Sequence, residues 1–309
     1  MREAVHLVKI RSVPGRSDLK PYLVDRQKKI DRALDAFLPK ERTRPSTIHK
    51  AMRYSLFAGG KRLRPILTLA TAEACGGKIE QAMPLACAIE CIHTYSLVHD
   101  DLPSMDNDDF RRGRPTCHKV FGDGIAVLAG DALLTIAFEI VSHAKPARRY
   151  DMATLLREVA IAAGSRKLIA GQVADLEAEG KESSRNDLLF IHENKTSAIL
   201  TASVCLGAMS ANATTKELSA ITKFGRNLGL AFQVIDDILD VTQTTEKLGK
   251  SAGKDIAAKK ATYPSVIGLE ESRMEARRLT RRAHQVLDIF GAKAARLREL
   301  ADYLLEREY

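Results

Sequence analysis

The apolar residues of this 309-residue chain recur at the spacing of an α-helix along nearly its whole length. The first such pattern has successive spacings of 7, 4 and 4 residues, at Leu23, Ile30, Leu34 and Leu38. Further helical patterns cover residues 125–143, 151–179, 186–210, 215–240 and 265–308. No segment alternates between apolar and polar residues as a half-buried β-strand does. The pattern therefore predicts an all-α fold, a single-domain bundle of long helices.

Size and cysteine content fit a soluble domain in a reducing compartment. A chain of this length can bury about 75% of its unfolded surface, so its core needs no covalent support. The five cysteines include no CxxC pair, which favours buried thiols over a metal site and indicates a cytoplasmic location. No apolar signal segment is visible at the N-terminus. We expect residues 1–18 to form a mobile N-terminal extension and residues 19–309 to form the domain.

The net charge of +9 is concentrated near the N-terminus. Residues 1–64 contain 17 Lys and Arg against 6 Asp and Glu, whereas the remainder contains 31 against 33. Aromatic residues make up only 5% of the chain, and no pattern of stacking aromatics accompanies the basic residues. The longest uncharged stretch, residues 196–215, holds too many Ser and Thr residues to favour lipid. We therefore expect no nucleic-acid partner and no transmembrane segment.

The first group of chemistry-bearing residues is a run of five carboxylates within ten positions: Asp100, Asp101, Asp106, Asp108 and Asp109. Like charges this close repel by about 1 kcal/mol per pair even in water. A cation would relieve this repulsion, and oxygen ligands without Cys or His suit Mg²⁺. A solvated acidic loop is the alternative interpretation.

The second group lies within an apolar helical pattern and consists of Asp236, Asp237 and Asp240. The i, i+4 spacing places the first and last of these on one helix face. If the two acidic groups faced each other, they would hold several Mg²⁺ ions with coordination sites left for a diphosphate. An exposed acidic helix face is the alternative. Together the two groups predict a diphosphate substrate.

Basic residues accompany both acidic groups. Three cations follow the Gly59–Gly60 pair, and three more lie within residues 111–114, directly after the first acidic run. Arg offers a fork matched to phosphate oxygens and Lys a point charge. Each could be an ordinary surface charge, but beside the carboxylates some of them are expected to bind diphosphate.

Several motifs together resemble those of the trans-isoprenyl diphosphate synthases, most closely the bacterial type of farnesyl diphosphate synthase. They are GGKRLRP (59–65), IHTYSLVHDDLPSMDNDDFRRGRPT (92–116), VLAGDALL (127–134), GQVADLEAEGK (171–181), KT (195–196), FQVIDDILD (232–240) and LGK (248–250). The similarity covers about residues 19–309. It implies a helical bundle around a deep central cavity, usually a homodimer, with the two aspartate motifs facing each other at the cavity mouth.

The resemblance also implies roles for individual residues. About three Mg²⁺ ions, or Mn²⁺ in their place, would be held by Asp100, Asp101, Asp106, Asp236, Asp237 and Asp240. The allylic diphosphate would be contacted by Arg111, Lys195, Gln233, Lys250 and Lys260. Isopentenyl diphosphate would be bound by Lys61, Arg64, His93 and Arg112. The residues expected to take part in catalysis are Asp100, Asp101, Asp236, Lys195, Thr196 and Gln233.

Product length in this family depends on the depth of the cavity. Tyr95 and Ser96 precede Asp100 by five and four residues, and five helical residues span about 7.5 Å. In the bacterial farnesyl enzymes an aromatic residue here forms the cavity floor, so Tyr95 favours a C15 product. Ordinary core packing is the alternative role for Tyr95, and also for His93. Two alternative functions remain open: a synthase with a C20 product, and a non-catalytic partner subunit.

Overall fold

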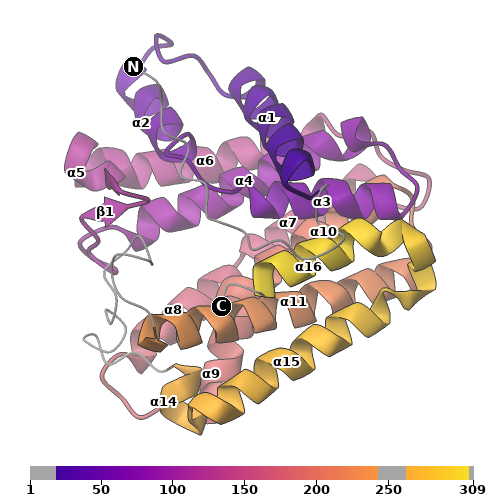
Figure 1. Ribbon diagram of the computed structural model, residues 1–309. Coiled ribbons are helices and arrows are strands. Elements are labelled where there is room, and N and C mark those ends of the chain that lie inside the picture. Colours follow the sequence, from indigo (N-terminus) through magenta and orange to yellow (C-terminus); the bar gives the residue numbers. More distant parts are fainter. Residues whose placement is uncertain (1–18, 243–261, 306–309) are drawn as a thin grey trace.

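The computed structural model describes residues 19–242 and 262–305, and almost all of them are helical (Figure 1). The expected extension at residues 1–18 and the expected diphosphate contacts Lys250 and Lys260 lie outside these ranges. The all-α prediction is confirmed. In chain order, the first helices are α1 (Leu19–Phe37), α2 (Ser46–Leu56), α3 (Leu63–Ala74), α4 (Ile79–Asp100), α5 (Cys117–Phe121), α6 (Asp123–Ser142), α7 (Met152–Ala163) and α8 (Leu168–Ala178). They are followed by α9 (Arg185–Ile191), the π-helix η1 (His192–Ser197), α10 (Ala198–Ser210), α11 (Thr215–Thr242), α14 (Tyr263–Ile267), α15 (Leu269–Val286), the 3₁₀-helix η2 (Asp288–Ala294) and α16 (Ala295–Leu305).

The structure divides two of the predicted helices. Residues 151–179 form α7 and α8 with a break between them, and residues 265–308 are interrupted at Gly268 and Gly291. Both glycines have positive φ angles, 85° and 55°, a conformation that ends a regular helix. The expected irregular stretch 102–124 also contains a short antiparallel hairpin. Its strands are β1 (Phe110–Arg111) and β2 (Arg114–Pro115).

The core is centred on α3, α4 and α10, which are buried on most sides. A helix that is apolar around its whole circumference must be covered by neighbours. In α10 small residues allow close approach, because a Cβ atom added at Gly207 would overlap the carbonyl oxygen of Thr68 in α3. Most of the uncharged stretch 196–215 thus lies in a buried helix, as expected.

One described helix, α6, is long and apolar enough to cross a membrane by length and composition alone. In this fold it packs along α4 (Figure 1) and buries one side, including Leu133, Ala137 and Ile140. Core helices of soluble proteins pass the same test, so this helix is weak evidence for a membrane span.

Two helices bring the acidic motifs to the same side of the molecule. In Figure 1, α4 and α11 both run from right to left and end at the left of the view. Asp100 is the last residue of α4, and Asp240 lies in the last turn of α11. The helix directions therefore place the two motifs at one end of the bundle.

Candidate active site

The first aspartate motif is folded tightly onto the end of α4. Asp100 and Asp101 are buried, with exposures of 7% and 3%. The backbone N–H of Asp106 donates to the carbonyl of Asp100 at 2.8 Å, and that of Asp108 donates to the carbonyl of Asp101 at 3.2 Å. These bonds satisfy carbonyl groups that a helix end leaves without partners. The loop therefore returns its carboxylates to the place where α4 ends.

Asp101 is paired with Arg111, which the β1–β2 hairpin brings back to the motif. The Arg111 Nε atom donates to both carboxylate oxygens, at 2.7 and 3.0 Å, and its Nη2 atom lies 2.6 Å from Oδ1. Burial still raises the pKa of Asp101. The charge of Asp101 is thus matched within the protein by a bidentate guanidinium.

Asp100 has a more strained electrostatic environment. Burial raises the pKa of its carboxyl to about 6, and the charge of Asp106 adds to the effect. Gln172 of α8 donates a hydrogen bond to Oδ1, and Lys195 opposes the rise. A carboxylate that is costly to ionise in isolation gains from a nearby cation.

Lys195 connects this motif with α8. Its Nζ atom lies 2.6 Å from Oδ2 of Asp175, and the charges of Asp100 and Asp175 outweigh burial and raise the pKa of Lys195. Gln172 and Asp175 belong to the GQVADLEAEGK motif but were not predicted as site residues. Their i, i+3 spacing, which places both on one face of α8, was the available signal.

Lys195 and Thr196 lie in the π-helix η1, a wide turn that is often found at functional sites. Two glycines allow neighbouring helices to approach it. A Cβ atom at Gly171 of α8 would overlap the backbone of Lys195, and one at Gly229 of α11 would lie 2.6 Å from the Cα atom of Ser197. The π-helix is therefore held between α8 and α11.

The second aspartate motif is linked to this turn by side-chain hydrogen bonds. The Thr196 hydroxyl donates to Oε1 of Gln233 at 2.8 Å, and Nε2 of Gln233 donates to Oδ1 of Asp237 at 3.0 Å. Oδ2 of Asp237 accepts the backbone N–H of Tyr263 at 2.9 Å. The adjacent Lys195 interacts electrostatically with Asp100, so residues 195–196 connect the two motifs.

Asp237 is thus engaged by protein donors on both oxygens, and the sequence did not foresee this. His192 also lies close, with Nε2 3.6 Å from Oδ2. No spacing in the sequence relates His192 or Tyr263 to Asp237, so neither was predicted at the site. The assignment of Asp237 to metal binding stays a prediction, as do those of Asp236 and Asp240.

Three of the four residues predicted to bind isopentenyl diphosphate interact electrostatically with one another: Arg64, His93 and Arg112. The pKa of His93 is held well below its usual value by burial and then by the charges of Arg64, Arg112 and Arg111. Burial lowers the pKa of Arg64 to about 10, and Arg112 contributes. Cations crowded in this way form a site suited to an anion.

Lys61, the fourth predicted contact, lies in the glycine loop beside this group. Arg112 donates to the carbonyl of Gly59, and a Cβ atom at Gly60 would lie 2.7 Å from the Arg112 Nη1 atom. The Lys61 ammonium lies 5.6 Å from the centre of the Tyr303 ring of α16. The φ angle of Gly60 is +120°, a conformation that favours glycine where the loop meets Arg112.

Arg62, in the middle of the same basic motif, has its guanidinium paired within the protein. Its guanidinium is buried and donates to Asp31 at 2.8 Å, to Glu90 at 2.9 Å and to the carbonyl of Leu56 at 2.8 Å. It fastens the loop to the core.

Tyr95 and Ser96 lie below Asp100 on α4. The Tyr95 ring is 5% exposed, and its hydroxyl donates to the carbonyl of Ala163 in α7 at 3.3 Å. The ring also meets His99 edge-on, with ring centres 5.8 Å apart. The Ser96 hydroxyl donates a hydrogen bond to the carbonyl of His93 at 2.9 Å.

The donors at this end of the bundle fit Mg²⁺. Within residues 19–242 and 262–305, no three His, Cys, Asp or Glu side chains are already clustered as a metal site. Mg²⁺ commonly uses one or two carboxylates together with substrate phosphates, so a ready-made cage is not required. The raised pKa of Asp100, caused by burial and the neighbouring Asp106, is the electrostatic strain that such an ion would relieve.

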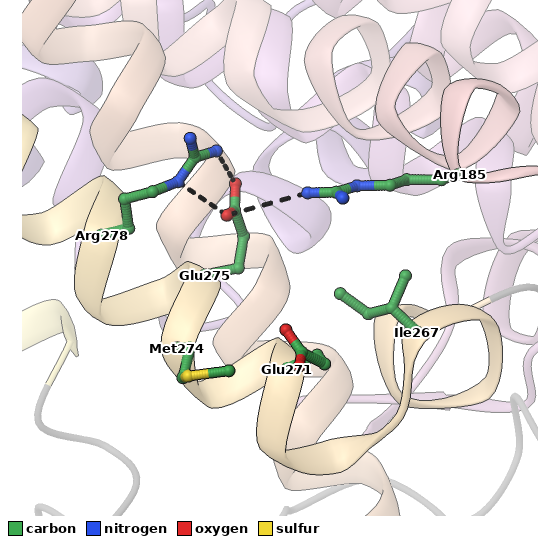
Figure 2. A pocket seen from close by; sticks show the side chains of 6 residues that line it. All are labelled: Arg185, Ile267, Glu271, Met274, Glu275 and Arg278. Carbon is green, nitrogen blue, oxygen red and sulfur yellow. Dashed lines mark hydrogen bonds and ion pairs between the residues drawn. The ribbon is translucent and has the colours of Figure 1, made fainter.

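A pocket of about 460 Å³ lies elsewhere, where α9 meets α14 and α15 (Figure 2). Glu275 occupies its wall and accepts hydrogen bonds from Arg278 at 2.8 and 2.6 Å, while Arg185 lies 3.9 Å away. The charges in this pocket are largely matched internally. It includes none of the predicted site residues.

Comparison with known proteins agrees with this arrangement. Residues 45–300 match the polyprenyl synthetase family. The chain is 48% identical to the heterodimeric geranylgeranyl pyrophosphate synthase large subunit 1 of Arabidopsis thaliana, over 96% of this chain and 82% of that protein. It is 49% identical to a dimethylallyltranstransferase of Fischerella ambigua, over 94% and 84% of the two chains.

Solved structures give the same result. A putative farnesyl-diphosphate synthase from a Marinomonas species superimposes with a TM-score of 0.80 at 38% identity, covering 93% of this chain and 99% of that one. The family uses divalent metal ions and binds isoprenyl diphosphates. The chain belongs to the polyprenyl synthetase family and is a prenyltransferase of the trans-isoprenyl diphosphate synthase type.

Proposed function

We propose that the chain is a farnesyl diphosphate synthase, which condenses isopentenyl diphosphate head to tail with dimethylallyl and then geranyl diphosphate. The observation that supports a C15 product is the position of Tyr95. Its buried ring lies about 7.5 Å along α4 from Asp100, and its hydroxyl is bonded to α7. A ring fixed at this depth limits the length of the prenyl chain that fits below the diphosphate.

Each group of residues has a role in the proposed reaction. Bound divalent ions would neutralise the charge that develops on the departing diphosphate. Arg111 and Lys195 add fixed positive charge beside the first aspartate motif. Thr196 and Gln233 are hydrogen-bonded to each other and would offer a hydroxyl and an amide to the diphosphate or the allylic carbocation. The surrounding apolar helices exclude water that would otherwise capture the cation.

The second substrate would be held by the cations around Arg64. Arg64 and Arg112 bring two positive charges together beside His93, and a diphosphate would relieve the repulsion between them. The double bond of isopentenyl diphosphate then attacks the allylic cation, and a proton leaves the product. We assign no protein base to that step.

A C20 product is the alternative, because the Arabidopsis relative is named a geranylgeranyl pyrophosphate synthase subunit.

In the deciding experiment, the protein is incubated with dimethylallyl and isopentenyl diphosphates and Mg²⁺, and the dephosphorylated products are analysed by mass spectrometry. A main product of C15 supports the proposal, and accumulation of C20 with little C15 contradicts it. No product from the protein alone would favour the non-catalytic partner, although both aspartate motifs are present.

We further propose that the protein is a homodimer that pairs through α6. This helix is strongly apolar, yet Val127 and Leu128 are 40% and 54% exposed on its outer side. A second copy offering the same face would cover them. The heterodimeric name of the Arabidopsis relative makes an unlike partner the alternative occupant.

A further inference from the structure

His192 was not among the residues expected at the site, yet it is packed against them. It is the first residue of η1, the same short turn that carries Lys195 and Thr196, and its side chain is 8% exposed. Its ring stacks on Tyr263 with ring centres 5.3 Å apart and planes inclined by 27°. His192 is therefore fixed in position by its surroundings.

A chain of polar contacts leads from His192 to Thr196. Nε2 of His192 lies 3.6 Å from Oδ2 of Asp237, a separation at which the attraction is electrostatic and not a formed hydrogen bond. Oδ1 of Asp237 accepts from Gln233, and Gln233 accepts from the Thr196 hydroxyl. A carboxylate only accepts, so Asp237 determines which end of the Gln233 amide faces it. That orientation in turn makes Thr196 the donor to Gln233.

The two ring nitrogens of His192 have unequal environments. Nδ1 is buried and has no hydrogen-bond partner among the described residues, whereas Nε2 faces a carboxylate oxygen. If Nδ1 alone carried a proton, Nε2 of His192 and Oδ2 of Asp237 would face each other as two hydrogen-bond acceptors. The geometry thus favours the proton on Nε2, pointing at Asp237.

We propose that His192 is a positioning residue for the condensation reaction, which holds Asp237 and thereby orients Gln233 and the Thr196 hydroxyl. The inference rests on the proposed function, because it assumes that Thr196 and Gln233 act on the diphosphate or the carbocation. His192 itself touches neither reacting group.

The test compares two substitutions of His192. His192→Phe keeps a ring to stack on Tyr263 but has no donor, whereas His192→Gln places an amide nitrogen near the position of Nε2. We expect kcat of the Phe variant to fall about tenfold and the Gln variant to recover part of the loss. The KM for isopentenyl diphosphate should stay within about twofold, because Arg64 and His93 are untouched. If the Phe variant does not fold, His192→Met supplies a second side chain without the donor.

His143→Phe is the matched control. The His143 ring also packs on an aromatic ring, that of Phe37, with centres 5.6 Å apart, but it lies at the far end of α6 from the site. Its kcat should be unchanged. Loss of activity in this control comparable to that of His192→Phe would show that any such change disturbs the fold, and would overturn the inference.

A double-mutant cycle with Thr196→Val separates positioning from general packing. If His192 acts through Thr196, adding His192→Phe to Thr196→Val should lower kcat by less than about twofold more. The inference would be overturned if the decrease in kcat of the double variant equalled the product of the decreases in the two single variants. An unchanged kcat in His192→Phe alone would also overturn it. In both cases the wild-type enzyme would still form prenyl diphosphates, so the proposed function would stand. A wild-type protein without condensation activity would overturn both.

Discussion

Single residues at this site are placed where burial and charge work against each other. Asp100 is 7% exposed beside Asp106, and the pKa of its carboxyl is raised to about 6, first by burial and then by that neighbour. Tyr95 on the same helix fills the space below with an aromatic ring. In the proposed function, Asp100 affects the binding of charge and Tyr95 affects the length of the product.

Shortening Tyr95 should lengthen the product. In Tyr95→Ala the ring and its hydrogen bond to Ala163 are lost, which opens space along α4 for further isoprene units. We expect C20 or longer alcohols in mass analysis of dephosphorylated products. Tyr95→Phe retains the ring and should keep the wild-type product. An unchanged product length in Tyr95→Ala would exclude Tyr95 as the cavity floor.

The raised pKa of Asp100 predicts a dependence of stability on pH. The folded protein holds the Asp100 proton more tightly than the unfolded chain does, so this stabilising contribution is complete below about pH 4. It is lost as the pH rises to about 6, which costs up to about 3 kcal/mol at neutral pH.

Asp100→Asn removes this ionisation and should raise the unfolding temperature at pH 7.5 without Mg²⁺. At pH 4 the variant and the wild-type protein should melt together. Thermal unfolding at both pH values measures the difference. A variant that is less stable at pH 7.5 than at pH 4, relative to wild type, would contradict the assigned pKa.

Among the elements, the π-helix η1 depends most on its neighbours. Gly171 of α8 and Gly229 of α11 let two helices touch its backbone at Lys195 and Ser197. A Cβ atom at either glycine meets backbone atoms, which cannot turn aside as a flexible side chain can. The wide turn that carries Lys195 and Thr196 is therefore maintained by close helix packing.

Gly171→Ala should disturb this turn. We expect a loss of about 1–3 kcal/mol in the free energy of unfolding from overpacking, and a larger relative loss of kcat because Lys195 moves. Gly124→Ala in α6 is the matched control, since a Cβ atom there meets nothing within 4 Å. That control should be neutral or slightly stabilising. Chemical denaturation and steady-state kinetics measure both effects, and equal behaviour of the two variants would refute the role of Gly171.

The sequence predicted the two acidic motifs but not the residues that contact them. The spacing of Asp236 and Asp240 within an apolar helix and the run after Asp100 were sufficient to predict a charged centre. The bonds of Gln172 to Asp100 and of Tyr263 to Asp237 join residues 72 and 26 positions apart, so no local pattern reports them. The helix breaks at Gly268 and Gly291 were signalled only by glycine, which helices also tolerate.

For the whole molecule, the exposed side of α6 predicts assembly. Leu128→Glu places a charge on this face, and in a dimer the charge would lie opposite its own copy near the symmetry axis. We expect light scattering to show a dimer for the wild-type protein and a monomer for the variant. Val24→Glu, at a residue of α1 that is 40% exposed, is the control and should stay dimeric. A monomeric wild-type protein, or a dimeric Leu128→Glu variant, would contradict pairing through α6.

The crowding of Arg64, His93 and Arg112 has a consequence for the resting protein. The Arg64 and Arg112 guanidinium groups repel each other, and their charges together with burial disfavour a proton on His93, whose pKa lies well below its usual value. An anion that binds there relieves this repulsion, and because it binds the folded state it raises the free energy of unfolding. Even inorganic pyrophosphate should therefore raise the unfolding temperature of the protein. The rise should become smaller as added salt screens the same charges.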